Sequence, residues 1–281
     1  MKPTEIKDLK LKANIFRQRI LDMIVKNKDS HIASAFSLVE ILVSLYYKIL
    51  NIDPKNPEWE DRDRFILSKG HGGATLYVTL AEKGFFPKSV LDTLCQPKSI
   101  LGGHPDMLRI PGVEASTGSL GHGLPIAIGI SLAAKTDQKS YRTYCLVGDG
   151  ECQEGTIWEA AMCAAQHKLD NLTAIVDYNK LQICGPVSDI VNLEPFLEKW
   201  KSFGWETVEI DGHNIEEIVS TLKKVPFKKD KPSAIIAHTV KGKGVSYMEN
   251  VTKWHSMLPD IEELKQAKKE LKDSEIKIIE N

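Results

Sequence analysis

One segment, residues 144–179, constrains the fold of this chain more than any other. It begins with an apolar run that breaks into Gly148-Asp149-Gly150, and it ends with a second β-rich run that leads into Asp177-Tyr178-Asn179. Small and apolar residues at helical spacing lie between the two runs. The segment therefore predicts a strand–loop–helix–strand unit of the kind that builds parallel sheets.

The polar residues at the two breaks indicate a ligand site. Asp149 and Asn179 are expected at the carboxyl ends of neighbouring strands, where parallel sheets place their ligands. One carboxylate and one amide oxygen suit Mg²⁺, which takes few protein oxygens and completes its shell with phosphate and water. The backbone N–H of Gly150 and the start of the following helix would then face a diphosphate. For a single Gly-Asp-Gly, the alternative is a tight turn with a capping aspartate.

Length and composition are those of a globular α/β protein. The 281 residues, 42% hydrophobic and 27% charged, can bury a substantial core. A formal net charge of −1 gives no electrostatic case for binding nucleic acid or an anionic membrane surface. No apolar run is long enough to span a membrane. The five cysteines are scattered and form no CxxC pair, which predicts reduced thiols in a cytoplasmic protein.

Histidines recur beside glycines in the loops. His71 lies in KGHGG, His104 follows two glycines, and His122 lies in GHG, while His31 stands at the entrance to a predicted helix. Flexible backbone beside groups that transfer protons near neutral pH is typical of a polar active site. For His31 alone, a helix cap or a satisfied core residue is the alternative.

The remaining patterns predict the architecture. We expect strands at residues 64–67, 143–147, 173–177, 205–210 and 233–238. They indicate one α/β domain over residues 1–281, with a central, mostly parallel sheet and helices on both faces. Residues 260–281 are highly charged and predict a C-terminal tail helix on the surface. The KGKG at residues 241–244 lacks the Lys-Ser/Thr ending of a phosphate-binding P-loop, so no nucleotide site is predicted there.

Five motifs, in order, resemble the N-terminal, thiamine diphosphate-binding part of transketolase. They are RDRFILSKGH, STGSLGHG, GDGECQEG, DYNKLQ and HTVKGKGVSYMEN followed by Trp254-His255. The match runs from about Leu9 to His255 and implies the thiamine diphosphate-binding fold. Transketolases carry a pyrimidine-binding domain and a C-terminal domain after this one. The resemblance therefore implies the N-terminal subunit of a split transketolase, with those two domains on a separate C-terminal subunit.

The resemblance also implies thiamine diphosphate with Mg²⁺ as the cofactor. Asp149 and Asn179 match the side-chain ligands of the metal, and Leu181 matches a residue that gives it a backbone carbonyl. The positions that match cofactor-contacting residues of the family are His71, Gly118, Leu120, Gly150, Glu154, Asp177, Asn179 and His255. The positions that match catalytic residues of the family are His31, His71, His104 and His255, in the sugar-phosphate channel, and Glu154, at the subunit interface.

The implied reaction moves a two-carbon ketol unit from a ketose phosphate to an aldose phosphate, as in the pentose phosphate pathway. In the family, the glutamate that activates the cofactor lies in the pyrimidine-binding domain, so we expect this subunit to be inactive alone. A homodimer of this subunit within a heterotetramer is implied. The residues after His31 and His255 depart from the usual family pattern, which predicts an unusual ketose phosphate or a related acid-bearing ketose as substrate.

Two other interpretations remain open at this point. The chain could be a component of another thiamine diphosphate enzyme, like deoxyxylulose phosphate synthase or the α component of a 2-oxo acid dehydrogenase. The QEG after GDGEC and the stretch from HTVKGKG to Trp254-His255 favour transketolase over both. The third interpretation is a non-catalytic paralogue that keeps the fold as an assembly partner.

Overall fold

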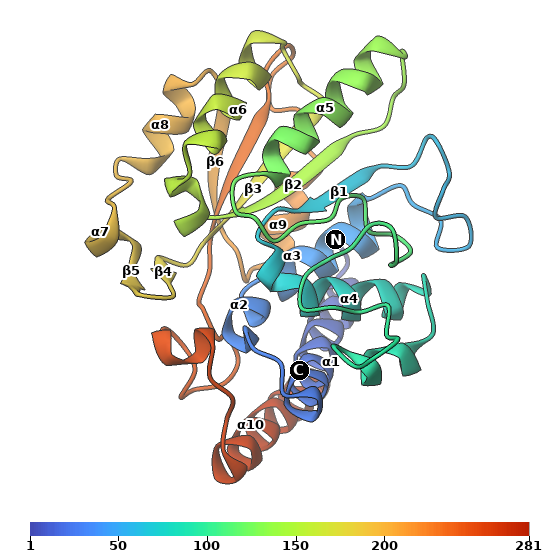
Figure 1. Cartoon of the computed structure of the whole chain (residues 1–281), viewed down its shortest axis with the longest axis vertical. Helices are drawn as coiled ribbons and strands as arrows, with labels where there is room; N and C mark the ends of the chain where they lie inside the picture. The colour runs from blue at the N-terminus through green and yellow to red at the C-terminus, as the bar shows by residue number, and fades with distance from the viewer. Residues whose placement is uncertain (281) are drawn as a thin grey trace.

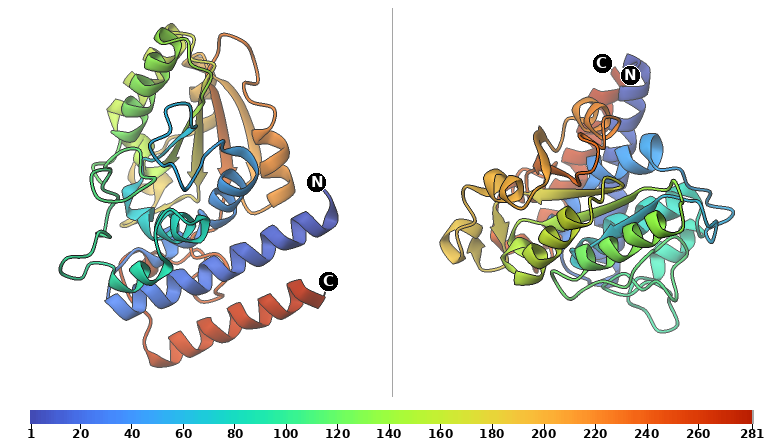
Figure 2. Two further views of the ribbon diagram at one scale, coloured as in Figure 1. Left: turned by 90° about the vertical axis from the view of Figure 1, so that its right-hand side faces the viewer. Right: turned by 90° about the horizontal axis from the view of Figure 1, so that it is seen from above.

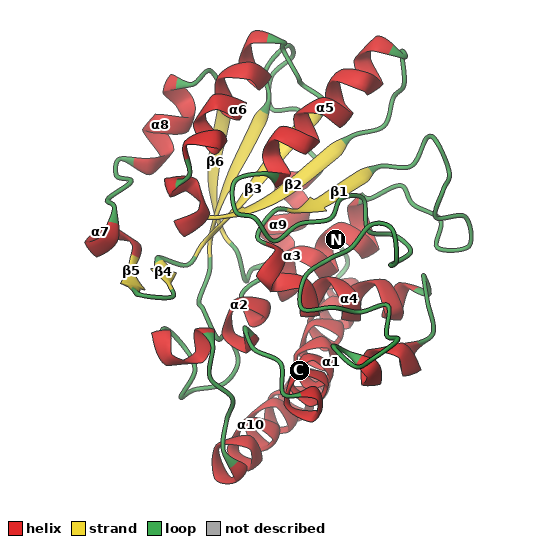
Figure 3. Cartoon of the chain, viewed as in Figure 1, coloured by secondary structure: helices red, strands yellow, loops and turns green. Residues whose placement is uncertain are grey.

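A five-stranded sheet forms the centre of the computed structural model, which describes residues 1–280 (Figures 1 and 3). Every neighbouring pair of strands in this sheet is parallel. The strand order is β1 (Arg64–Leu67), β2 (Thr143–Gly148), β3 (Leu172–Tyr178), β7 (Ser233–His238) and β6 (Glu206–Asp211). All five strands were expected from the sequence, and their bounds differ from the expected ones by at most one residue.

Helices cover both faces of the sheet, as the sequence predicts. The α-helices of the described residues are α1 (Pro3–Asn27), α2 (Ile32–Phe36), α3 (Val39–Ser44), α4 (Gly73–Lys83), α5 (Gly123–Thr136), α6 (Gly155–Gln166), α7 (Val187–Ile190), α8 (Phe196–Ser202), α9 (Ile215–Leu222) and α10 (Ile261–Glu280). A π-helical turn, Leu45–Ile49, continues α3. A short antiparallel hairpin, β4 (Leu181–Gln182) and β5 (Gly185–Pro186), follows β3 and was not expected.

The alternation of side chains along the strands creates two hydrophobic cores, one on each face. In β2, Tyr144 and Leu146 join the core beneath α1, α3, α4 and α9, while Cys145 and Val147 join the core beneath α5, α6 and α8. Successive side chains of a strand point to opposite faces of the sheet. Because both faces of this sheet are buried, the sequences of its strands are continuous apolar runs.

The charged C-terminal segment forms α10, which runs alongside α1 (Figure 2). Its buried residues, Ala267 and Leu271, lie four positions apart and therefore share one helical face. The rest of α10 is largely exposed, so the helix lies on the surface as expected but is held by this apolar seam. Among residues 1–280, no helix combines the length and the apolar character needed to cross a membrane.

The parallel sheet brings its loops to one edge. Gly148 pairs with Asp177, and Tyr178 pairs with His238, so the loops that follow β2, β3 and β7 begin side by side. The segment after β1 joins them through a 3₁₀ turn, Gly70–Gly72. The expectation that Asp149 and Asn179 follow neighbouring strand ends is confirmed.

Candidate functional site

A pocket of about 380 Å³ opens at this edge of the sheet. Its lining residues are His31, Lys69, His71, His104, Gly118, Leu120, Gly148, Asp149, Gly150, Glu151, Gln153, Glu154, Asn179, Leu181, Gln182, Ile183, Lys241 and His255. The pocket thus brings together every site residue that the sequence predicted except Asp177 and His122, whose side chain is exposed and outside the lining. A larger depression, of about 560 Å³, lies between α1 and α10 and contains none of the predicted residues.

Four histidines cluster on one wall of the pocket. The His31 ring lies 5.2 Å from that of His255, 5.6 Å from that of His71 and 6.3 Å from that of His104. Burial lowers the pKa of His31, and burial together with the Lys69 charge holds the pKa of His71 well below its ordinary value. Burial and the Lys241 charge lower the pKa of His255 to about 3. These three rings are therefore neutral near pH 7, and each offers both a donor and an acceptor.

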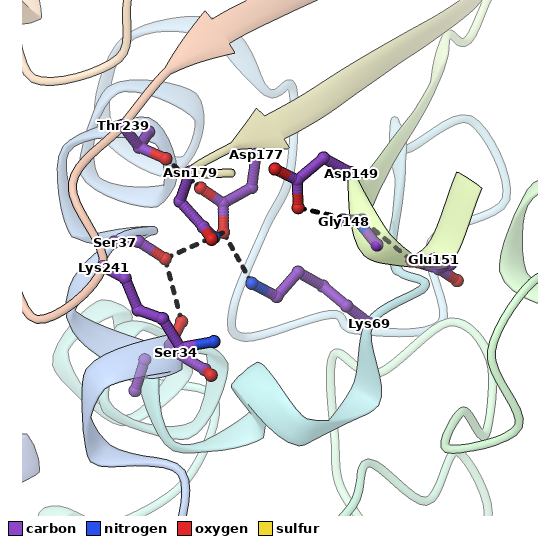
Figure 4. A network of polar contacts seen from close by, with 12 residues as sticks. Ser34, Ser37, Lys69, Gly148, Asp149, Glu151, Asp177, Asn179, Thr239 and Lys241 are labelled. Carbon is purple, nitrogen blue, oxygen red and sulfur yellow. Dashed lines mark hydrogen bonds and ion pairs between the residues drawn. The ribbon is translucent and has the colours of Figure 1, made fainter. Parts of the chain in front are cut away.

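Asp177 is fully buried and is not one of the lining residues; it lies at the centre of a polar network (Figure 4). Its carboxylate accepts hydrogen bonds from Ser37 Oγ at 2.8 Å, from Asn179 Nδ2 at 3.0 Å and from Thr239 Oγ1, and it pairs with Lys69 Nζ at 2.5 Å. Burial alone would raise the pKa of Asp177, but the Lys69 charge and these donors lower it. Asp177 is therefore an ionised hub that joins four segments.

The carboxylate of Asp149 is also buried, and among residues 1–280 no ammonium forms an ion pair with it; the nearby Lys69 pairs with Asp177 instead. One Asp149 oxygen accepts from the N–H of Gly150 at 2.7 Å, and the other accepts from the N–H of Lys180. Burial and the charge of Asp177 raise the pKa of Asp149 to about 7. A buried carboxylate in this state suits a bound cation, which would stabilise its charged form.

The other two predicted metal-binding residues are beside Asp149. The amide oxygen of Asn179 accepts from the N–H of Leu181 at 3.1 Å, which folds residues 179–181 into a tight turn. The carbonyl oxygen of Leu181 accepts from Lys241 Nζ at 3.2 Å. Carboxylate, amide and carbonyl oxygens are the ligand types that Mg²⁺ prefers, so the donor set fits that ion.

Lys241 is a pocket residue that the sequence reasoning missed. Only 2% of it is exposed, and its ammonium donates to the Leu181 carbonyl and contacts His255 Nδ1 at 2.8 Å. Both partners are neutral, and burial together with the charge of Lys69 lowers the pKa of Lys241 to about 8. A buried ammonium held by neutral acceptors fits an anionic ligand such as a diphosphate. The signal was the KGKG that follows a buried strand.

Glu151 is a second missed residue. Its buried carboxylate accepts from the N–H of Gly121 and the N–H of Gly148, each at 2.9 Å, and from Ser68 Oγ. Burial raises the pKa of Glu151. The side chain joins the loops after β1 and β2 to the turn that opens α5, and so it fixes the shape of the pocket floor.

Two glycines allow the pocket walls to approach closely. A Cβ on Gly150 would lie 2.7 Å from Gln182 Oε1, and a Cβ on Gly118 would lie 3.2 Å from the His104 ring. Gly118 also has a φ of +154°, which side-chain-bearing residues rarely adopt. Leu120 and Glu154 line the rim; Leu120 is half-buried and Glu154 is exposed.

The histidine cluster predicts a pH-dependent stability. Below about pH 6.5 the unfolded chain protonates its histidines while the folded chain keeps His31, His71 and His255 neutral, so the free energy of unfolding should fall as the pH drops. Urea unfolding of the cofactor-free chain between about pH 7.5 and about pH 5.5 measures this slope. His255→Gln should flatten it, whereas His167→Gln, at an exposed position, should not. An unchanged slope for H255Q would contradict the neutral, buried state of this ring.

Comparison with known proteins gives consistent matches. Residues 9–277 match the family model described as the thiamine diphosphate binding domain of transketolase. The chain is 44% identical over 269 residues to one subunit of the apulose-4-phosphate transketolase of Phocaeicola vulgatus, a match that covers 96% of this chain and 95% of that protein. It is 46% identical over 250 residues to the 6-deoxy-6-sulfo-D-fructose transketolase subunit SqwG of a Clostridium species, covering 89% of this chain and 91% of that one.

Solved structures give the same result. The transketolase of Campylobacter jejuni superimposes with a TM-score of 0.88 at 34% sequence identity. The match covers 96% of this chain and 45% of that one, so the chain spans less than half the length of that protein.

Proposed function

Because the chain belongs to the transketolase family of thiamine diphosphate-binding domains, we propose that it is the N-terminal subunit of a split transketolase. Three relatives that it matches along at least 91% of their length are named as transketolase subunits. The reaction would transfer a ketol group, and a separate subunit with the pyrimidine-binding and C-terminal domains would complete the site.

The observation that carries this proposal is the pair of buried, oppositely charged groups at one edge of the sheet. Asp149 suits a cation and Lys241 suits an anion, and both line the same pocket. Mg²⁺ with a diphosphate satisfies both. We propose that Asp149, Asn179 and the carbonyl of Leu181 hold Mg²⁺.

The remaining contacts of thiamine diphosphate follow from the lining. We propose His71, His255, Gly150 and Lys241 for the diphosphate. For the rings and the subunit interface we propose Gly118, Leu120 and Glu154, with Asp177 supporting Asn179. When bound, thiamine diphosphate supplies the electron sink that allows a carbon–carbon bond to break.

The chain's own contribution to catalysis is orientation. His31, His71 and His255 are neutral near pH 7, so each can donate a hydrogen bond to a sugar oxygen or accept one from a sugar hydroxyl. His104, at the edge of the cluster, would bind hydroxyls farther from the cofactor.

For the substrate, we propose a ketose with an anionic group at its far end. One relative is named for apulose 4-phosphate and another for 6-deoxy-6-sulfo-D-fructose. The two named sugars share a ketose end and a terminal anion, phosphate in one and sulfonate in the other. Xylulose 5-phosphate, the pentose phosphate pathway donor, belongs to the same class.

For the assembly and its location, we propose a homodimer of this subunit within a heterotetramer, in the cytoplasm. All five cysteines are free thiols, which suits a reducing compartment.

Reconstitution tests the function. The subunit alone should show no ketol transfer, and activity should appear when it is co-expressed with a chain that carries the other two domains. Donors to compare are xylulose 5-phosphate, apulose 4-phosphate, 6-deoxy-6-sulfo-D-fructose and pyruvate, with release of the shortened aldehyde or ketone as the readout.

Two outcomes would contradict the proposal. Turnover of pyruvate without ketose turnover would assign the chain to another class of thiamine diphosphate enzyme. Absence of calorimetric binding of thiamine diphosphate with Mg²⁺ to the assembled complex would favour a non-catalytic assembly partner.

A further inference from the structure

We propose that His213, held by Glu40 and Arg17, is a positioning residue outside the pocket that fixes residues 239–242 and thereby sets the place of Lys241. None of these three side chains lines the pocket. They come from the turn before α9, from α3 and from α1. The consequence for ligand binding rests on the proposed function, whereas the structural effect does not.

The hydrogen bonds of His213 define its proton. The N–H of Val240 donates to His213 Nε2 at 2.8 Å, so this nitrogen must carry a lone pair. The ring proton of the neutral form is then on Nδ1, which lies 2.9 Å from Glu40 Oε2 and donates to it. Burial alone would raise the pKa of Glu40, but Arg17 and His213 lower it to about 2, so Glu40 is an ionised acceptor.

Arg17 fixes Glu40 from the opposite side. Its two terminal nitrogens each lie 2.6 Å from one oxygen of Glu40, a two-pronged contact. The second nitrogen also donates to the carbonyl of Phe36 at 3.1 Å, at the end of α2. The side chains of Arg17, Glu40 and His213 are 7%, 9% and 12% exposed, so the contacts are shielded from water.

Val240 lies between two residues that serve the site. Before it, Thr239 Oγ1 donates to Asp177; after it, Lys241 reaches Leu181 and His255. The N–H of Gly242 donates to the carbonyl of Ala33 at 3.0 Å. His213 therefore fixes the backbone between Thr239, which contacts Asp177, and Lys241. Arg17, which binds Glu40, also fixes the end of α2, the helix that begins after His31.

Three substitutions of His213 distinguish a role in positioning the backbone from a role in packing alone. His213→Gln places an amide oxygen near the location of Nε2, so it can still accept from Val240. His213→Asn is shorter and reaches only toward Glu40, and His213→Phe removes both contacts. The matched control is His238→Phe, because His238 also faces a glutamate, Glu209 at 3.3 Å, but is 43% exposed, and its ring packs on Tyr178.

The first readout is hydrogen exchange of residues 239–245 in the cofactor-free chain on its own, because every contact tested lies within this chain. Exchange should be faster in H213N and H213F than in the wild type, and close to wild type in H213Q and H238F. The second readout is the dissociation constant of thiamine diphosphate with Mg²⁺. It should rise by about tenfold or more in H213N and H213F, the effect typical of residues that orient a ligand-binding group.

The outcomes decide the proposal. Equal exchange in H213Q and H213N would overturn it, because both keep a polar side chain but only one reaches Val240. Wild-type exchange in H213F would overturn it as well. If the wild-type complex binds no thiamine diphosphate, the proposed function fails, and the exchange data still decide the role of His213. If H213F does not fold, the comparison of H213Q with H213N decides it.

Discussion

Asp149→Asn is expected to reduce the affinity for thiamine diphosphate with Mg²⁺ by about 100-fold, because removal of a charged oxygen from a metal or hydrogen-bond contact costs about 3 kcal/mol. Ketol transfer at a fixed, limiting cofactor concentration should fall in parallel. Calorimetry on the assembled complex measures the affinity, and Asp137→Asn, at an exposed position at the end of α5, is the matched control.

Although D149N should lose cofactor affinity, its free energy of unfolding without cofactor should not fall. A carboxyl group whose pKa is raised by folding opposes folding fully above its raised pKa, and this effect is lost as the pH falls from that value to its ordinary pKa. With the pKa of Asp149 at about 7, D149N without cofactor should be at least as stable as the wild type at about pH 8. Unfolding of D149N at lower urea than the wild type, with unchanged cofactor affinity, would mean that Asp149 is structural.

Lys69→Met is expected to lower the free energy of unfolding by about 3–5 kcal/mol, because it leaves the buried charge of Asp177 without its cation. Thermal or urea unfolding of the cofactor-free chain measures the loss. Lys135→Met is the control, since its ion pair with Asp170 is partly exposed and should contribute at most about 1 kcal/mol.

A double variant sharpens this test. Lys69→Met combined with Asp177→Asn removes both charges and should recover part of the loss, since the remaining penalty is then one of hydrogen bonding alone. If K69M loses no more stability than K135M, the ion pair is not desolvated as described.

The sequence predicted the sheet and most of the pocket for a clear physical reason. Strands buried on both faces appear as apolar runs, and parallel strands bring the residues after each run to one edge. Asp149 and Asn179 were therefore found from their positions after two apolar runs. Their proximity follows from the register of β2 with β3.

Contacts between segments far apart in the chain were not predictable in this way. A lysine is usually exposed, so the residues around Lys69 do not signal its burial, and the KGKG around Lys241 marks the end of a strand but not the burial of the ammonium. Asp177 was expected in the site, but the hydroxyl of Ser37, 140 residues away, and that of Thr239 enclose it. The contact of His213 with Glu40 spans 173 residues, and the local pattern of its turn reveals only the cap at Asn214.

The parallel sheet has a practical consequence for handling the protein. Because the pocket lies entirely at the carboxyl edge, the loops at the amino edge, such as residues 223–232 before β7, are directed away from it. Lys228 and Lys229 in that loop are exposed. Attachment of a dye, a solid support or a fused reporter there keeps the attached group away from the pocket, which makes this loop a suitable site for immobilising the protein.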